Sequence, residues 1–327
     1  MKRRSCLIRC VIILVIGMGN ICVADVEILD PNFMSQIYAS YECPGTERYP
    51  REIAFDNNGN IYLSHWESYD AGIGSVYYVT PDVTVTKWID DIPLPRRIVC
   101  GSGTAYDDYL YIGSGLWGDS AILQVKSDGT YKTFASVSRA PHALALDRYG
   151  SYGGYMYTAT RANDHIYSIA PDGTVSLFSE FPGPGGDGGG PTDICFDPGL
   201  DYGGLMYMAT DFVGAPDNSG IFVLDVSGNA IRFAFDILGA ASVEIDAIGL
   251  FSGEMFVSSR IGPSQDDPVS IWRVSPDGEI TEFAWSLSAP NGLPAFTFGP
   301  DGSMYVPEFF PDSETVVITR ISPVLTH

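Results

Sequence analysis

Short apolar segments separated by turn residues recur along the whole chain. One kind of segment has an aromatic residue at its second position and a small or compact residue at its fourth. Its copies are IYLSHW (61–66), LYIGSG (110–115), MYTATR (156–161), MYMATD (206–211), MFVSSR (255–260) and MYVPEF (304–309). Alternate residues of a β-strand lie on one face of the sheet, so these two positions share a face. The pattern predicts strands whose sheets pack closely against one another.

These segments recur at a nearly constant spacing. The aromatic residues are at positions 62, 111, 157, 207, 256 and 305, so the gaps between them are 49, 46, 50, 49 and 49. Repeats of this length are typical of solenoids and propellers. Each repeat also has an apolar segment before the aromatic one, such as HALALD (142–147), and a hairpin after it, such as IAPDGTVSLF (169–178). In the second and fifth repeats the preceding segment is less regular, and we assign it to RRIVCG (96–101) and DAIGLF (246–251).

Each repeat therefore predicts four short strands, with no helical periodicity between them. Six such units predict an all-β fold, a six-bladed β-propeller with four antiparallel strands per blade. The last repeat lacks its outer strand. Residues 34–38 (MSQIY) match the missing strand, because Tyr38 lies 50 residues before Trp88 in the outer strand of the first repeat. We expect this N-terminal strand to close the last blade, which leaves no open edge and makes residues 25–327 a single domain.

Residues 1–24 have a different pattern. Lys2, Arg3, Arg4 and Arg9 form a basic start, an apolar run follows, and small residues lie before Asp25. This is the pattern of a secretory signal peptide, and the run is short for a membrane span. An uncleaved N-terminal anchor is the alternative. We expect a secreted protein, periplasmic or extracellular, with no membrane span after cleavage.

Composition narrows the range of partners. The chain has 18 Lys and Arg residues against 40 Asp and Glu residues, a net charge of −22. Without the four basic residues of the signal the charge is (18 − 4) − 40 = −26. Such a surface repels nucleic acid and anionic membranes, and it suits cations, cationic partners or solubility alone. Cys43, Cys100 and Cys195 follow the signal, so at most one disulfide pairs within the chain. We expect a monomer.

The repeat motif resembles that of a known group of propellers. The pattern P-x-x-[IL]-x-[FL]-D-x-x-G-x-[IM]-Y, followed by Pro-Asp-Gly, is similar to NHL-type and SMP-30/gluconolactonase-like six-bladed propellers and to the propeller of streptogramin lyase. The resemblance covers essentially the whole of residues 25–327 and implies the fold. It leaves the function open, because propellers include hydrolases, lyases and proteins that only bind.

Charged and aromatic residues gather at one end of the expected ring. In propellers generally, the first strand of each blade begins, and the second ends, at the same face around the axis. The candidate ligand-binding residues at this face are His65, Trp66, Arg97, Trp117, His142, Arg161, His165, Asp211, Arg260 and Glu308, and Arg51 and Arg96 also begin first strands. Loops on a rigid ring are a common binding surface, so we expect this face to bind a glycan, a peptide, a small polar molecule or a protein. The alternative is that the Trp residues pack loops, the His residues are structural and the charges pair with one another.

The resemblance to SMP-30-like lactonases implies a second function. Those enzymes hold a divalent cation at the mouth of the axis with Glu, Asn and Asp. The candidate metal ligands here are Glu52, Asp193, Asp246 and Asn291, and such an oxygen shell suits Ca²⁺ or Mg²⁺. The cation would polarise a lactone carbonyl while a carboxylate acts as base. Two departures count against this function: Glu52 follows Pro50 instead of preceding a Gly-Pro or Ser-Pro pair, and Asn291 falls in the last repeat.

A lyase like streptogramin lyase is the third hypothesis. That chemistry needs a His base near a bound Mg²⁺, late in the chain. The sequence has four His residues, and His327, the last residue, is the only one beyond position 165. The sequence therefore assigns no catalytic residue and leaves open whether the protein is an enzyme.

Overall fold

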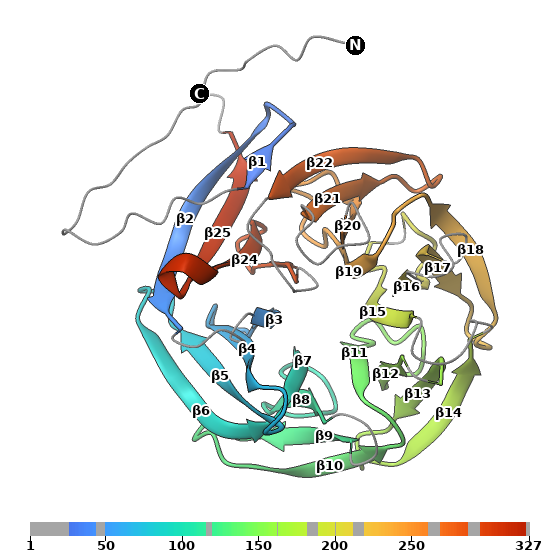
Figure 1. Cartoon of the computed structure of the whole chain (residues 1–327). Helices are drawn as coiled ribbons and strands as arrows, with labels where there is room; N and C mark the ends of the chain where they lie inside the picture. Colours follow the sequence, from blue (N-terminus) through green and yellow to red (C-terminus); the bar gives the residue numbers. More distant parts are fainter. Residues whose placement is uncertain are drawn as a thin grey trace.

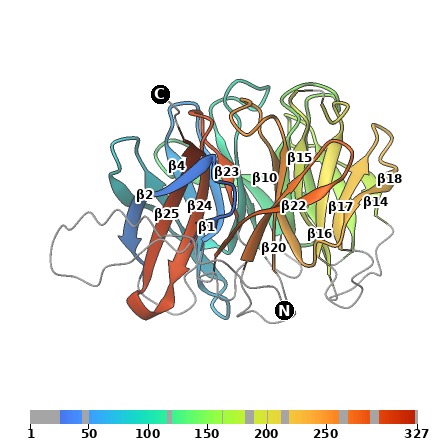
Figure 2. The same cartoon turned by 90° about the horizontal axis from the view of Figure 1, so that it is seen from above.

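Six β-sheets are arranged in a ring around a central axis (Figure 1), and their strands run between the two ends of the ring (Figure 2). This computed structural model describes residues 26–43, 50–115, 120–161, 163–181, 189–199, 201–211, 219–260, 269–286 and 295–324. The six-bladed propeller expected from the sequence is confirmed, with four-stranded antiparallel sheets as the basic unit.

The blades are numbered from β3 onwards, inner strand first. Blade one has β3 (Pro50–Phe55), β4 (Ile61–Ser68), β5 (Ile73–Val79) and β6 (Val85–Pro93); blade two has β7 (Pro95–Cys100), β8 (Leu110–Ser114), β9 (Ser120–Val125) and β10 (Tyr131–Val137). Blade three has β11 (Pro141–Leu146), β12 (Met156–Thr160), β13 (His165–Ile169) and β14 (Val175–Glu180); blade four has β15 (Gly190–Phe196), β16 (Met206–Asp211), β17 (Gly220–Leu224) and β18 (Ala230–Phe235). Blade five has β19 (Ala240–Ile245), β20 (Met255–Arg260), β21 (Val269–Val274), β22 (Ile280–Ser286) and β1 (Glu27–Ile28). Blade six has β23 (Thr297–Phe298), β24 (Met304–Phe310), β25 (Thr315–Pro323) and β2 (Phe33–Glu42), with a 3₁₀ helix (Pro311–Ser313) between β24 and β25.

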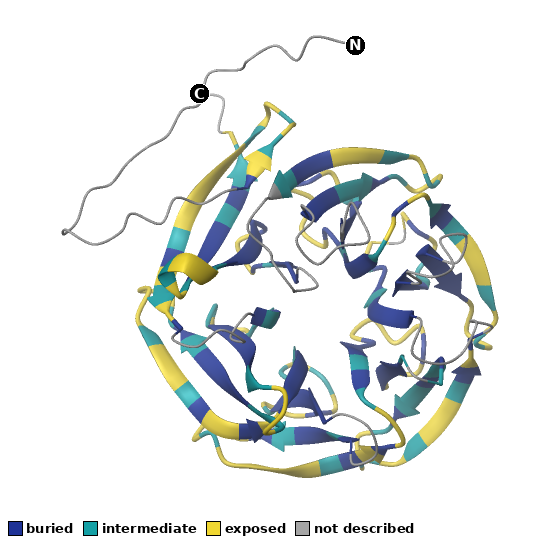
Figure 3. Ribbon diagram, in the orientation of Figure 1, coloured by how far each residue is buried: buried dark blue, intermediate teal, exposed yellow. Residues whose placement is uncertain are grey.

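The hydrophobic core lies between consecutive blades. Buried residues dominate the inner strands, and exposed ones appear mainly along the outer strands (Figure 3). Tyr157 on β12 packs edge-on against Phe178 of its own blade and Phe196 of blade four, with ring centroids 5.0 and 5.6 Å apart. Ala159, two residues further along β12, is fully buried in the same cluster. The aromatic and the small position of the repeat therefore share a face that packs against the neighbouring sheet, as the sequence pattern indicated.

The N-terminal segment closes the ring. β2 pairs antiparallel with β25, with Met34 opposite Ser322 and Gln36 opposite Arg320, and it is the outer strand of blade six as expected. The sequence did not predict β1, which pairs with β22 through Glu27 and Ile28. One short segment therefore contacts both blades five and six.

The inner strand of blade five lies earlier in the chain than DAIGLF (246–251), the segment assigned from the sequence. β19 ends at Ile245, and residues 246–251 form a loop. The Asp246 carboxylate organises this loop by accepting hydrogen bonds from the backbone N–H groups of Gly249 (2.9 Å) and Phe251 (2.5 Å). Asp147 and Asp197 accept backbone hydrogen bonds in the same way at the ends of β11 and β15. The assignment of DAIGLF as a strand was therefore wrong.

Buried tyrosines in the loops after β7, β11 and β15 connect blades two, three and four each to the next blade. The hydroxyl group of Tyr202 in blade four donates to the carbonyl of Val274 (2.5 Å) and accepts from the N–H of Met255 (2.7 Å), both in blade five. Tyr106 and Tyr152 make the same pair of bonds to blades three and four. A buried backbone group without a partner is costly, so these bridges fix how neighbouring blades are placed.

Candidate functional site

Three charged residues occupy equivalent positions on inner strands. Glu52 on β3, Arg97 on β7 and Asp193 on β15 each precede a buried isoleucine, and 6–7% of their surface is exposed. These isoleucines belong to the hydrophobic core between blades. Because neighbouring residues of a strand point to opposite faces, the residue before each isoleucine points away from that core. We call the end of the ring at which β3, β7, β11, β15 and β19 begin the upper face.

The Arg97 side chain links blade two to the blades on the other side of the axis. Its Nε donates to the carbonyl of His142 in blade three (2.9 Å). Its Nη2 donates to the carbonyl of Thr192 in blade four and to that of Ala241 in blade five, both at 2.9 Å. A guanidinium is planar and carries five N–H donors in fixed directions, so it can hold several fixed acceptors at once.

The same guanidinium is paired with two buried carboxylates. Arg97 Nη1 donates to Glu52 and lies 3.4 Å from Oδ2 of Asp193. Asp193 Oδ2 also accepts from the hydroxyl of Ser242 (2.7 Å) and the N–H of Val243 (3.0 Å). Burial raises the pKa of both carboxyl groups, although the charge of Arg97 opposes the rise. Arg97 therefore links five of the six blades around the axis, through contacts with two carboxylates and three backbone carbonyls.

A third carboxylate near the axis was missed from the sequence. Glu244 lies on β19, and its Oε1 accepts a hydrogen bond from the hydroxyl of Thr297 (3.1 Å). Desolvation raises the pKa of Glu244 to about 8, and the nearby Asp193 and Glu52 carboxylates add to the rise. The sequence did contain a signal for it. Asp147, Asp197 and Asp246 each directly follow an inner strand, so aligning the repeats at these residues places Glu244 in the inner strand of blade five.

We expect Glu244→Gln to stabilise the protein above neutral pH. The folded-state pKa lies above the ordinary value of 4.5, so the folded state binds more protons and its stability falls as the pH rises from about 4.5 through 8. Glutamine removes the charge that faces Asp193 and Glu52, and it leaves Arg97 and Thr297 in place. Thermal unfolding should show equal melting temperatures at pH 5 and a gain of roughly 2–5 °C at pH 8.5. A variant that is less stable than the wild type at both pH values would contradict this account.

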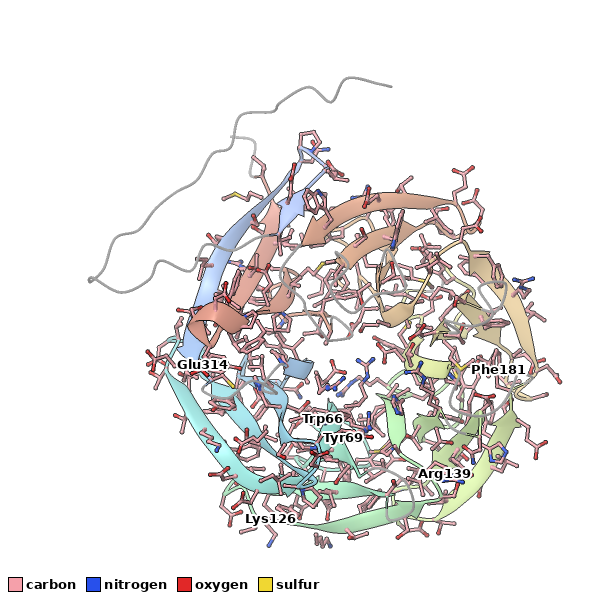
Figure 4. All side chains as sticks on the ribbon, in the orientation of Figure 1. Trp66, Tyr69, Lys126, Arg139, Phe181 and Glu314 are labelled. Carbon is pink, nitrogen blue, oxygen red and sulfur yellow. The ribbon has the colours of Figure 1, made fainter. Side chains whose placement is uncertain are left out.

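Trp66 carries two guanidinium groups at the upper face. The Cζ atom of Arg51 lies 3.6 Å, and that of Arg96 4.5 Å, from the centroid of the Trp66 ring. The indole N–H donates to the carbonyl of Pro95 (2.8 Å), and 6% of the residue is exposed. Figure 4 shows Trp66 beside Tyr69, whose side chain is exposed. Trp66 was predicted as a ligand contact, and in the structure its ring lies against the two arginines.

His142, on β11, is exposed to the positive charges of four arginines. Burial and the charges of these arginines lower its pKa well below the usual range, so the free imidazole is neutral; the four are Arg96, Arg161, Arg51 and Arg97. Arg161 follows β12 and is ion-paired with the fully buried Asp211 of blade four, Nη2 to Oδ2, at 3.2 Å. The structure thus brings together Arg97, His142, Arg161 and Asp211 of the predicted site. We call Arg51, Arg96, Arg161 and His142 the arginine cluster.

Two predicted His residues lie elsewhere and have structural partners. His65 is completely buried, with Nε2 2.6 Å from the hydroxyl of Tyr41 and Nδ1 3.6 Å from Sγ of Cys43. It therefore packs between blades one and six. His165 begins the third strand of blade three, and its Nδ1 lies 3.1 Å from Asn163 and 3.0 Å from the hydroxyl of Tyr167. His165 is thus separated from the axis by two strands of its own blade.

The remaining predicted residues are distributed around the ring. Glu308 is buried on β24, accepts from the hydroxyl of Thr319 (2.6 Å) and lines a small, mostly apolar cavity between blades five and six. Asp246 directly follows β19 at the face opposite the upper face, so its expected place at the mouth was wrong. Trp117 and Asn291 lie outside the described residues, as does the side chain of Arg260.

The candidate ligands that the structure describes at the axis, Glu52 and Asp193, do not fit a divalent cation. Glu52 and Asp193 lie together as expected, but their oxygen atoms accept from Arg97 and from backbone and hydroxyl donors, and Arg97 supplies the positive charge between them. Within the described ranges, no group of three or more His, Cys, Asp or Glu side chains is arranged to hold a metal ion.

The fold and this site define a six-bladed propeller whose upper face carries a cluster of arginines. No protein-family profile and no curated protein sequence matches the chain. Among solved structures, the chain is similar to virginiamycin B lyase from Staphylococcus aureus, with 15% identity and a TM-score of 0.56 over 89% of this chain and 100% of that one. It is also similar to a putative gluconolactonase, with 13% identity and a TM-score of 0.57 over 92% and 96% of the two chains. An auxiliary nutrient binding protein from Bacteroides thetaiotaomicron has 11% identity and a TM-score of 0.58 over 85% and 69%.

At such low sequence identity, the structural similarity shows a shared fold and does not indicate a shared activity. The resemblance to gluconolactonase-like and lyase-like propellers, expected from the repeat motif, is confirmed in this sense. None of the helices in the part of the chain that the structure describes is long and apolar enough to cross a membrane.

Proposed function

We propose that this chain is an exported binding protein that holds a small polar molecule or a saccharide at its upper face. The observation that carries the proposal is the arginine cluster, assembled from the starts of three inner strands and the end of β12 in an otherwise acidic protein. Tyr69 adds an exposed aromatic ring beside it. The opposite face gives less support, because the carboxylates of Asp147, Asp197 and Asp246 bind the backbone of their own loops.

A hydrolase that uses a metal ion is the weaker candidate. It would need the oxygen atoms of Glu52 and Asp193, which already bind Arg97 and neighbouring donors. No observation favours it over binding.

The test is ligand-induced stabilisation of the mature protein, residues 25–327. We expect at least one of three trisaccharides (maltotriose, N,N′,N″-triacetylchitotriose or trigalacturonate) to raise the melting temperature, because a ligand that binds only the folded state stabilises it. Tyr69→Ala at the upper face should reduce this shift. Tyr149→Ala is the matched control, since Tyr149 is equally an exposed tyrosine but lies in the loop at the opposite face.

Two outcomes count against the proposal. One is that none of the three sugars changes the melting temperature at millimolar concentration. The other is that Tyr149→Ala, and not Tyr69→Ala, abolishes the shift, which would place the ligand on the opposite face.

A further inference from the structure

The arginine cluster concentrates positive charge in a protein that is otherwise strongly acidic. The chain carries 40 acidic residues against 18 basic ones, yet the guanidinium groups of Arg51 and Arg96 lie on one tryptophan ring, and their charges act on His142 together with those of two further arginines. Like charges held close together in a partly desolvated place destabilise the free protein. A group of opposite charge that enters from solution relieves this repulsion, so the cluster favours an anion.

The positions of the guanidinium groups are fixed by their surroundings. Arg51 and Arg96 lie on the ring of Trp66, and the Nε of Arg96 also donates to the carbonyl of Gly115 (3.2 Å). The attraction between a cation and an aromatic ring offsets part of the repulsion between the two arginines. Both side chains are thus ordered before any ligand arrives, which lowers the entropic cost of binding.

Arg161 adds a donor that the described part of the protein does not use. Its Nη2 is paired with Asp211, but its Nε is buried and has no hydrogen-bond partner within the described part of the chain. A buried donor without an acceptor is costly, so it is a place where a ligand oxygen gains a strong hydrogen bond.

Arg97 follows Arg96 on β7 and so lies one residue further from the upper face than the cluster. Its pairing with Glu52 and Asp193 keeps these carboxylates at the axis, with their oxygen atoms bound to the guanidinium, to backbone donors of their own strands and to the hydroxyl of Ser242 on β19. The cluster itself is therefore dominated by positive charge and neutral His142, with Asp211 as the carboxylate paired to Arg161.

We propose that Arg51, Arg96, Arg161 and His142 form a binding site for an oxyanion, a carboxylate, sulfate or phosphate group, of a small ligand or acidic sugar. This inference rests on the proposed function and names the chemistry of its ligand. Guanidinium groups match such anions through paired N–H···O bonds. The bound anion favours the protonated form of His142, so binding is coupled to proton uptake and strengthens as the pH falls.

The first test is calorimetric titration of the mature protein with three anions: galacturonate, inorganic sulfate and inorganic phosphate. Ionic strength is kept constant with KCl, and maltotriose is the neutral probe. We expect saturable binding of at least one anion, weakened about tenfold or more in Arg51→Gln. Arg232→Gln is the matched control, because it removes the same charge from an exposed position on the outer strand β18. The three anions separate a preference for carboxylate from one for sulfate or phosphate.

The second test is measured on the protein with an unaltered cluster, and a variant is used only to assign a signal. The chain has four His residues, so their ring protons give few NMR signals, and His142→Gln assigns one of them. We expect the apparent pKa of His142 to rise when the favoured anion is added and not when KCl or maltotriose is added. This readout stands even if Arg51→Gln fails to fold.

The results distinguish the inference from the function on which it rests. Anions that bind Arg51→Gln and Arg232→Gln equally, or that leave the His142 titration unchanged, overturn the oxyanion site. If a neutral trisaccharide still binds through Tyr69 in that case, the binding function survives. If neither the anions nor the trisaccharides bind, both proposals fail.

Discussion

Arg97→Ala is expected to destabilise the protein by about 3–5 kcal/mol, which is the usual loss when one partner of a buried ion pair is removed. The variant leaves the carboxylates of Glu52 and Asp193 buried without their cation, and it removes the donors to the carbonyls of Thr192 and Ala241. Denaturant unfolding at pH 8 measures the change directly. The loss should be smaller at pH 5, because the two carboxyl groups then take up protons and no bare charge stays buried.

Two further variants separate charge from packing. Glu52→Gln added to Arg97→Ala should recover part of the lost stability, since it removes one of the unpaired charges. Arg320→Ala is the matched control: Arg320 is paired with Asp301 at 2.6 Å, but both side chains are partly exposed, so about 1 kcal/mol or less is expected. Equal losses for Arg97→Ala at pH 5 and pH 8 would mean that Arg97 acts through its backbone hydrogen bonds and packing and not through its charge.

The fold could be predicted because its signal is repeated. The aromatic residue and the small residue of the second strand recur at a constant spacing, and each copy supports the others. Closure by residues 34–38 followed from the same spacing and from the missing outer strand of the last repeat. β1 could not be predicted in this way, because two residues, Glu27 and Ile28, carry no periodicity of their own.

Blade five shows where the pattern misled. DAIGLF contains alternating apolar residues, but Asp246 binds the backbone N–H groups of the residues that follow and turns them into a loop. The hydrophobic pattern does not record such a local hydrogen-bond network. The misplacement put Asp246 at the mouth and hid Glu244, which lies on the true inner strand.

The site was predicted in part. The expectation that inner-strand starts share one face placed Glu52, Arg97, His142 and Asp193 together, and the contacts of Arg97 agree with that placement. What each residue does there depends on distances that no sequence pattern encodes. The sequence did not indicate, for example, that Arg97 reaches across the axis and pairs with two of the candidate metal ligands, Glu52 and Asp193.

The closing strand should be as important for stability as the core. A chain that begins at Cys43 lacks β2, and we expect it to lose its cooperative unfolding transition and to accumulate as insoluble protein. β2 contributes the buried Ala39 and the partly buried Tyr38 and Tyr41 to the core cluster, and without it β25 becomes an open edge that pairs with other chains. The loss is comparable to the whole stability of a domain, about 5–15 kcal/mol. Soluble yield and circular dichroism measure the outcome.

A chain that begins at residue 31 is the matched control, because it lacks β1 and retains β2. β1 makes a single two-residue pairing with β22, so this chain should fold with a modestly lower melting temperature. The peptide FMSQIYASYE (33–42), added during refolding of the chain that begins at Cys43, should restore the transition by occupying the edge of β25, since added strands pair through the backbone. If the chain beginning at Cys43 unfolds at the wild-type temperature without the peptide, the ring is held by the interblade packing and the axial contacts of Arg97, and strand closure is dispensable.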